Sequence, residues 1–272
     1  MATIHFILQG KGGVGKSMIA SLLYQTMQEQ DQNVFAYDTD PVNSTLGAYK
    51  EFTVHRIELM KHGDIDPRQF DALFQGLMEA PDGSHVIVDN GASSFVALGT
   101  YLKENEVLPV LQEAGHKVYF HSVITGGQAI SDTLNGLANL LQSFPDASII
   151  VWLNPYFGEI ALQGKSFEQM KIYQEYSSRI SHLISLPHVP PATLGKDLEE
   201  LFAKRYSFKA GIADSTASIA VKSRLRLFWQ TTSELIVNAF SEDIVISSAK
   251  ANDNEAEAES TNDDMPEEES NE

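Results

Sequence analysis

The run from Gly10 to Ser17 carries residue types that can bind a chain of phosphates. Its letters, GKGGVGKS, fit the pattern GxxxxGK[ST], and it directly follows the apolar stretch from Ile4 to Leu8. Glycines let successive backbone N–H groups point at phosphate oxygens, the Lys16 ammonium neutralises β and γ charge, and the Ser17 hydroxyl is a ligand for Mg²⁺. The pattern therefore predicts a phosphate-binding loop between a buried strand and a helix, which binds a nucleoside triphosphate with Mg²⁺.

The same run defines which residues we expect to contact the nucleotide. Backbone groups of the loop and of the first helical turn supply most of the contacts in such a site. The alternative is a glycine-rich turn that happens to carry a surface lysine. The expected nucleotide-binding residues are Gly12, Gly13, Val14, Gly15, Lys16, Ser17 and Met18.

A second acidic group is expected at the end of a neighbouring strand. The segment from His85 to Val88 reads as a buried strand, and Asp89 follows it directly. A strand of this kind delivers its last residue to the carboxyl edge of the sheet, where ligands bind. We therefore predict that Asp89 holds the Mg²⁺ hydration shell. The alternative is an ordinary strand-ending aspartate in a turn.

Short apolar runs alternate with helical patterns along most of the chain, which predicts a doubly wound, mostly parallel sheet of the P-loop type covered by helices. The expected strands are Ile4 to Leu8, Val34 to Tyr37, His85 to Val88, Val118 to Ile124, Ile149 to Leu153 and Leu183 to Leu186. The expected helices are Ser17 to Gln30, Pro67 to Met78, Phe95 to Asn105, Ala129 to Ser143, Phe167 to Ile180, Asp197 to Phe202 and Asp214 to Phe240.

The apolar rhythm stops soon after Ile246, so we expect one P-loop domain over 1–246. The net charge of the chain is −18, and the segment from Ala251 to Glu272 holds ten acidic residues without a Lys or Arg. Such a composition cannot offset the entropy of ordering, which predicts a disordered acidic tail over 247–272. A solvating tail is the default role. An acidic competitor for a nucleic-acid site or a docking segment is the alternative.

The chain contains no cysteine, which excludes disulfides, a thiol nucleophile and cysteine-ligated clusters. It has no signal peptide pattern and no long apolar run, so we expect a cytoplasmic protein without a membrane span. The acidic C-terminus also argues against a membrane-binding helix.

A lysine directly after the first glycine, Lys11 in KGGVGKS, resembles the deviant-Walker ATPases of the ParA and MinD family. In that family the early lysine reaches across a dimer interface to the phosphates of the partner's nucleotide. The resemblance implies a homodimer that depends on ATP, with Lys11 and Lys16 in catalytic roles. ATP and Mg²⁺ are the implied cofactors.

The run Asp38-Thr39-Asp40-Pro41 resembles the DxDP switch motif of the same family. The resemblance implies that Asp40 positions the attacking water and that Asp38 supports the Mg²⁺ shell. The loop after Asp89, from Asn90 to Ser94, would respond to the γ-phosphate, although it lacks the threonine and prolines common in the family. The alternative for the DxDP run is an Asx turn closed by Pro41.

Asn154 follows the expected strand from Ile149 to Leu153, at a point where the family uses an asparagine to read adenine. An Asn before Pro155 is also a common turn signal, which leaves the alternative of a plain turn. The chain has no N-K-x-D motif for guanine, so ATP is favoured over GTP.

The segment from Lys204 to Arg226 is locally basic in an acidic chain. A cluster of this kind can bind DNA phosphates without sequence preference, as the late helices of ParA-like proteins do. The expected DNA contacts are Lys222, Arg224 and Arg226. A solvated helix face is the alternative.

Within the family, the segments from Ile7 to Ala20, Asp38 to Asn43 and Asp89 to Ala92 look like the TraL-type proteins of conjugative plasmids, and StbB-type stability proteins are similar. This resemblance implies an ATP-dependent role in plasmid transfer or in plasmid partition and stability, with a plasmid-encoded partner protein that the sequence does not identify. The alternative is a metabolic ATP-dependent ligase or amidase of the same fold that acts on a carboxylate substrate.

Overall fold

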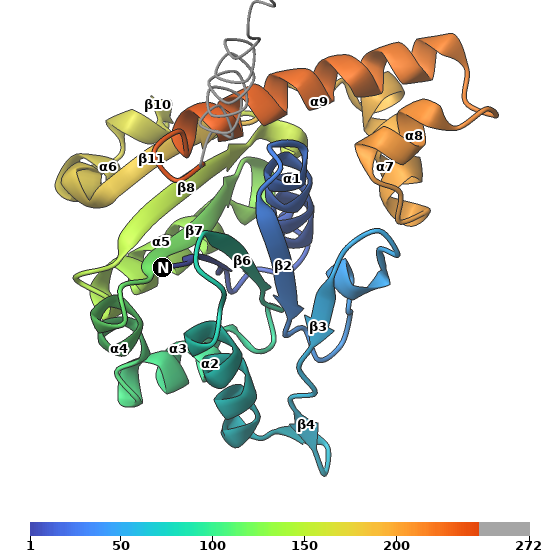
Figure 1. Cartoon of the computed structure of the whole chain (residues 1–272). Helices are drawn as coiled ribbons and strands as arrows, with labels where there is room; N and C mark the ends of the chain where they lie inside the picture. The colour runs from blue at the N-terminus through green and yellow to red at the C-terminus, as the bar shows by residue number, and fades with distance from the viewer. Residues whose placement is uncertain (245–272) are drawn as a thin grey trace, which may run out of the picture.

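A computed structural model describes residues 1–244 of the chain (Figure 1). The domain end expected at residue 246 and the expected acidic tail over 247–272 lie outside the described residues. No helix among the described residues is long and apolar enough to cross a membrane.

A seven-stranded sheet lies at the centre of the molecule, and all of its neighbouring strands are parallel. The expected doubly wound parallel sheet is therefore confirmed. In spatial order the strands are β11 (Ile180–Ser185), β8 (Ser148–Asn154), β7 (Lys117–Thr125), β1 (Thr3–Ile7), β6 (Ser84–Asp89), β2 (Asn33–Asp38) and β3 (Val54–Arg56). Two short hairpins are added, β4 (Met60–Lys61) with β5 (Asp64–Ile65) and β9 (Ala161–Leu162) with β10 (Lys165–Ser166).

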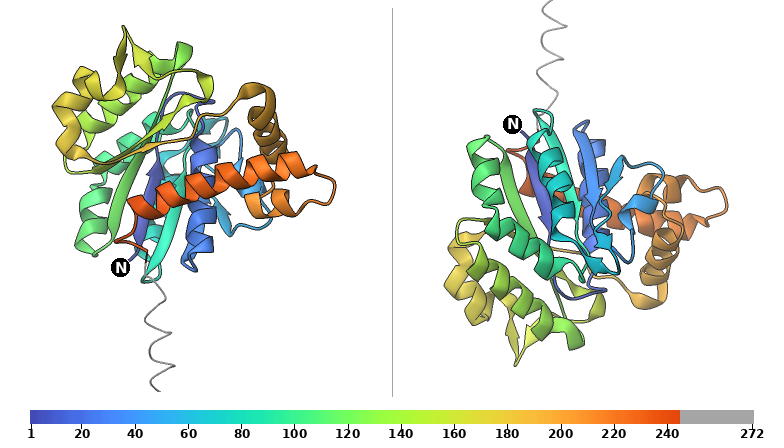
Figure 2. Two further views of the ribbon diagram at one scale, coloured as in Figure 1. Left: turned by 90° about the horizontal axis from the view of Figure 1, so that it is seen from above. Right: turned by 90° about the horizontal axis from the view of Figure 1, so that it is seen from below.

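Helices cover both faces of this sheet, as the two views of Figure 2 show. Alternate residues of one strand enter different cores, so that Ile4 and Phe6 of β1 face one set of helices while Ile7 faces the other. The first face is covered by α2 (Phe70–Met78), α3 (Phe95–Glu104), α4 (Val107–Glu113), α5 (Ile130–Ser143) and α6 (Lys171–Tyr176). The second is covered by α1 (Lys16–Glu29), α7 (Lys196–Ala203), α8 (Phe208–Ala213) and α9 (Ile219–Ala239).

The long helix expected from Asp214 to Phe240 is wrong at its start. The structure has α8, then a turn, then α9 from Ile219. Asp214 accepts hydrogen bonds from the N–H and hydroxyl groups of Thr216, and Ser218 caps α9 by accepting from the N–H of Val221. Short polar side chains that bond to nearby backbone groups favour turns over helix, which explains the break.

Several other elements differ from expectation, beginning with the two short hairpins. The helix expected from Phe167 to Ile180 is reduced to α6, because Met170 adopts an extended conformation (φ −75°, ψ 147°) that interrupts it. The edge strand β3 and the short helix α4 were not expected. Both are too short to show a periodic apolar pattern.

A row of three buried histidines, hereafter the histidine chain, crosses the sheet beneath α9. The indole N–H of Trp152 donates to Nδ1 of His121 at 2.9 Å. Nε2 of His121 lies 3.1 Å from Nδ1 of His5, and Nε2 of His5 lies 3.1 Å from Nδ1 of His85. The last ring reaches the backbone oxygen of Asp243 through Nε2 at 3.3 Å.

The groups at the two ends of the histidine chain fix the direction of every hydrogen bond in it. Trp152 can only donate and the Asp243 carbonyl can only accept, so each histidine must be neutral, with its proton on Nε2. Burial, followed by repulsion from His182, lowers the pKa of His121 to about 3. Burial and its two histidine neighbours hold the pKa of His5 well below its usual range. Burial also lowers the pKa of His85, against the opposing effect of Asp243.

We expect the free energy of unfolding to fall as the pH drops below about 6.5, the value for an unperturbed histidine. Because these pKa values are depressed in the folded state, the unfolded protein binds more protons than the folded protein below pH 6.5. The stability that comes from the neutral histidines is therefore present above pH 6.5 and lost below it. Three such sites give a slope of at most about 4 kcal/mol per pH unit. The raised pKa of the buried Asp89 acts in the opposite direction and reduces this slope by up to about 1.4 kcal/mol per pH unit. Urea unfolding at pH 7.5, 6.5 and 5.5 measures the slope.

The exposed His55 offers a matched control, because His55→Gln removes a histidine that is not part of the histidine chain and should leave the slope unchanged. A free energy of unfolding that stays level or rises between pH 6.5 and 5.5 would contradict the neutral histidine chain.

Candidate functional site

The loop between β1 and α1 has the conformation that its glycines permit. Gly13 (φ +75°) and Gly15 (φ +106°) lie in the left-handed region, where other residues are strained. Gly15 precedes the first residue of α1, so the free N–H groups of the helix N-terminus face the loop. The loop expected from the sequence is therefore present between a buried strand and a helix.

Lys16 is the buried cation of this loop. Its ammonium donates to the backbone oxygen of Lys11 at 3.1 Å, across the curl of the loop. Burial lowers the pKa of Lys16, and the negative charges of Asp89 and Asp40 oppose that shift. The site therefore holds a partly compensated positive charge beside the loop N–H groups, a combination suited to phosphate.

Asp89 lies at the end of β6, where the sheet brings it beside two other strand ends. Its Cα pairs with that of Ile7 on one side and with that of Asp38 on the other. Within the described part of the chain, neither of its buried carboxylate oxygens has a hydrogen bond of normal geometry. Burial raises the pKa of Asp89 to about 7, while the nearby Ser17 hydroxyl and the Lys16 ammonium act to lower it.

This arrangement fits a Mg²⁺ ion that is held together with a nucleotide. No cluster of three or more His, Cys, Asp or Glu side chains in residues 1–244 could bind a metal by itself. Mg²⁺ usually keeps several waters and binds through one or two protein oxygens plus substrate phosphates. The Ser17 hydroxyl and the unpartnered Asp89 carboxylate are the protein groups that could serve it.

Asp38 and Asp40 organise the loop that follows β2. The Asp38 carboxylate accepts from the N–H of Asp40 at 3.1 Å, from the Ser44 hydroxyl at 2.8 Å and from the N–H of Gly47 at 3.0 Å. The Asx turn weighed as an alternative is thus present at Asp38. Its role in the Mg²⁺ shell stays a prediction.

Asp40 also accepts hydrogen bonds from its own loop, but through only one of its two carboxylate oxygens among the described residues. Oδ1 accepts from the N–H groups of Val42 and Asn43, at 2.9 and 3.0 Å. Gly91 of the neighbouring loop lies so close that a Cβ there would come within 2.6 Å of the Asp40 carboxyl carbon. The two loops therefore touch at the residue expected to orient water.

A buried network that sequence reasoning missed joins these two loops. Oδ1 of Asn90 accepts from the hydroxyl groups of Thr39 and Ser94, at 3.0 and 2.8 Å. The Ser94 hydroxyl also lies 3.1 Å from the backbone oxygen of Thr39, and the N–H of Thr39 donates to the oxygen of Asp89. Small polar residues in a loop carry no sequence signal for this partnership, because the partners are about fifty positions apart.

Lys11 points away from its own phosphate loop. Its ammonium forms an ion pair with Asp132, in the first turn of α5, at 2.8 Å, and 43% of its side chain is exposed. Exposed pairs of this kind contribute little to stability, so the lysine can leave it readily.

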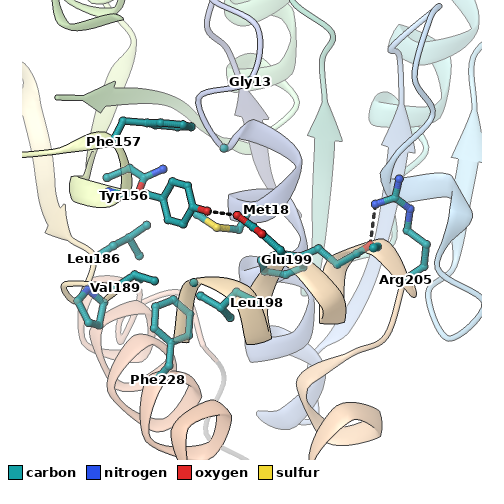
Figure 3. Close-up of a pocket in the computed structure, with 16 residues that line it drawn as sticks. Gly13, Met18, Tyr156, Phe157, Leu186, Val189, Leu198, Glu199, Arg205 and Phe228 are labelled. Carbon is teal, nitrogen blue, oxygen red and sulfur yellow. Dashed lines mark hydrogen bonds between the residues drawn. The ribbon is translucent and has the colours of Figure 1, made fainter. Parts of the chain in front are cut away.

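Two cavities open beside the phosphate loop and share part of its wall. The polar cavity, of about 620 Å³, is lined by the loop, by residues 40–45 except Pro41, and by Ala92 and Ser93. The apolar cavity, of about 400 Å³, is lined by side chains that include Tyr156, Phe157, Leu186 and Phe228 (Figure 3). Both volumes lie in the range of small-molecule sites.

Asn154 lines the apolar cavity and is tied to the loop. Its Nδ2 donates to the backbone oxygen of Val14 at 3.0 Å, and its Oδ1 accepts from the N–H of Tyr156 at 3.2 Å. A Cβ on Gly15 would approach Nδ2 to 2.9 Å. The structure thus places Asn154 beside the loop, and its contact with adenine stays a prediction.

The basic segment near the C-terminus has less free charge than its sequence suggested. Arg224 forms a two-pronged ion pair with Asp197 of α7, at 2.5 and 3.1 Å, and Lys204 pairs with Asp214 at 3.5 Å. Arg224 is therefore held within the helical layer. Lys222 and Arg226 have no ion pair among the described residues, and DNA binding through them stays a prediction.

Comparisons with known proteins agree with this fold and loop. Residues 5–185 match the family model described as the CobQ/CobB/MinD/ParA nucleotide binding domain. The chain belongs to this nucleotide-binding family.

Two Escherichia coli proteins, each named Protein TraL, are 45% identical to the chain over 228 residues, which cover 84% of this chain and 94% of theirs. Among solved structures, the MinD cell division protein of Aquifex aeolicus matches with 14% identity and a TM-score of 0.47, over 84% of this chain and 97% of that one. The resemblance inferred from the sequence, to the ParA and MinD family and to TraL-type proteins within it, is confirmed.

We expect Asp89→Asn to raise the free energy of unfolding of the nucleotide-free protein at pH 8 by about 1–3 kcal/mol. A raised pKa in the folded state means that this group's contribution is fully present below pH 3.8 and lost as the pH rises through about 7. At pH 8 the folded protein must therefore hold a buried carboxylate that Ser17 and Lys16 compensate only in part, a cost that the amide reduces. Urea unfolding at pH 8 and pH 5 measures the difference, which should be smaller at pH 5.

Asp64→Asn provides the matched control, since it makes the same charge change at an exposed position of β5. An Asp89→Asn protein that is less stable than the wild type at pH 8 would show that the carboxylate is compensated after all.

Proposed function

We propose that this chain is a Mg²⁺-dependent ATPase that acts as a dimeric, nucleotide-dependent switch in plasmid transfer or in plasmid partition and stability. The observation that carries the proposal is the pair of cavities that meet at the phosphate loop, one polar and one apolar. A nucleoside triphosphate has the same division, with a charged phosphate chain at one end and a flat apolar base at the other.

The residues of the polar cavity divide the work of hydrolysis between them. The loop N–H groups and Lys16 bind the phosphates, and Mg²⁺ would add charge neutralisation at the β- and γ-oxygens. Asp40 would orient the attacking water with its Oδ2, to which no described residue donates a hydrogen bond. Its contact with Gly91 would transmit the loss of the γ-phosphate to the loop after β6.

The proposed dimer rests on the position of Lys11. An exposed lysine on the outer side of a phosphate loop cannot serve its own nucleotide while it is paired with Asp132. A second copy of the chain that docks over the polar cavity would bring its nucleotide within reach. The role in plasmid transfer or maintenance rests on the 45% identity to the TraL proteins. An unidentified plasmid-encoded protein would act as the partner of the switch.

We expect Lys16→Ala to weaken binding of ATP with Mg²⁺ by about 100-fold, because it removes charge-assisted hydrogen bonds to the β- and γ-phosphates. Isothermal titration calorimetry measures the affinity. Lys50→Ala, which removes an exposed lysine outside both cavities, is the control and should bind like the wild type. Wild-type affinity in Lys16→Ala would refute the phosphate-loop assignment.

We expect Lys11→Ala to bind ATP as a monomer but not to form the ATP-dependent dimer, since the lysine would act on the partner's phosphates. Multi-angle light scattering with ATP, in an Asp40→Ala background that slows hydrolysis, measures the dimer. Asp132→Ala breaks the same ion pair from the other side and should keep the dimer. If Lys11→Ala dimerises as well as Asp132→Ala does, the lysine does not act across an interface.

A further inference from the structure

Arg205 lies in the turn that joins α7 to α8, far in the sequence from the phosphate loop. Its backbone is left-handed (φ +55°), a conformation that residues other than Gly, Asn and Asp adopt rarely. The guanidinium NH1 donates to the backbone oxygen of Phe202 at 2.8 Å, which fixes the direction of the side chain (Figure 3). The left-handed backbone belongs to the end of α7, where the N–H groups of Arg205 and Tyr206 donate to the backbone oxygens of Phe202 and Leu201. The turn is thus explained locally, and the side chain alone calls for a role.

The two cavities of the candidate site both include Arg205 in their walls. Within residues 1–244, the other residues that line both are Gly13 and Gly15 of the phosphate loop and Met18 of α1. The remaining walls of the polar cavity come from the phosphate loop and the two loops after β2 and β6. In the described part of the chain, Arg205 is therefore the residue that the segment from α7 to α9 contributes to the polar cavity.

The guanidinium of Arg205 has spare hydrogen-bonding capacity. Among the described residues it forms no ion pair, and its bond to Phe202 uses one of five N–H donors. Its neighbour Lys204 differs, since that ammonium pairs with Asp214 and lies at another part of the surface. A half-buried guanidinium that faces a polar cavity without an acidic partner suits an anionic oxygen.

We propose that Arg205 is a nucleotide-binding residue whose guanidinium bonds the phosphate nearest the base. The inference rests on the proposed function, because it takes the polar cavity as the phosphate site and the apolar cavity as the base site. The position where the two cavities join corresponds to the α-phosphate of the nucleotide, which is the phosphate nearest the base. Since α7, α8 and α9 pack on one another, this bond ties the C-terminal helices to the nucleotide.

The test compares R205G, R205K and K204A with the wild type as full-length proteins. Glycine removes the side chain and also relieves the left-handed backbone, so R205G should keep the wild-type melting temperature or exceed it. We expect R205G to bind both ADP and ATP about tenfold more weakly, by the same factor, because the first phosphate is common to the two. R205K should lose less, and K204A should bind like the wild type.

A second readout addresses the link to the helices. Hydrogen exchange in α8, which has no residue in the walls of either cavity, should slow when ADP binds to the wild type and should slow less in R205G at saturating ADP. Wild-type affinity in R205G would overturn the inference while leaving the proposed function intact, and so would a loss confined to ATP. Failure of the wild type itself to bind ATP or ADP would instead overturn the proposed function, and the inference with it.

Discussion

The parallel register of three central strands is the constraint on which the site depends. With β1, β6 and β2 aligned, Ile7, Asp89 and Asp38 stand at the same level of one sheet edge. A parallel sheet places the carboxyl ends of all its strands on one side, so the phosphate loop and the loops after β2 and β6 leave the sheet together. A shift of one residue in β6 would turn Asp89 to the other face of the sheet and remove it from the site.

The candidate binding groups at this edge are held in an energetically unfavourable state. Asp89 is buried and receives no hydrogen bond of normal geometry from any described residue, and burial lowers the pKa of Lys16 despite the acidic residues near it. Groups in this state gain most when a ligand supplies the missing charge, because the cost of removing them from water has been met during folding. A phosphate chain with its metal supplies both signs at once. Binding and stability should therefore be strongly linked in this protein.

The three buried histidine rings beneath α9 are, by contrast, satisfied on both nitrogens. The histidine chain runs from Trp152 to Asp243 with a donor and an acceptor for each ring, and Phe240 packs edge-on against His5. This chain connects the end of α9 to the middle of the sheet. Arg205 connects the other end of the same helical layer to the cavities. The C-terminal helices are thus attached at both the core and the candidate site.

The sequence by itself determined the fold class and the phosphate loop, because both are written in local patterns: alternating apolar runs, and glycines at fixed spacing from Lys16 and Ser17. It also placed Asp38, Asp40 and Asp89 at strand ends. Only the tertiary structure paired Arg224 with Asp197, joined Thr39 to Asn90 and Ser94, and brought Arg205 to the cavities. The edge strand β3 likewise depended on its pairing with β2, a partner outside the local window. Each of these contacts joins positions whose proximity is set by packing, and neither residue type nor spacing encodes such proximity.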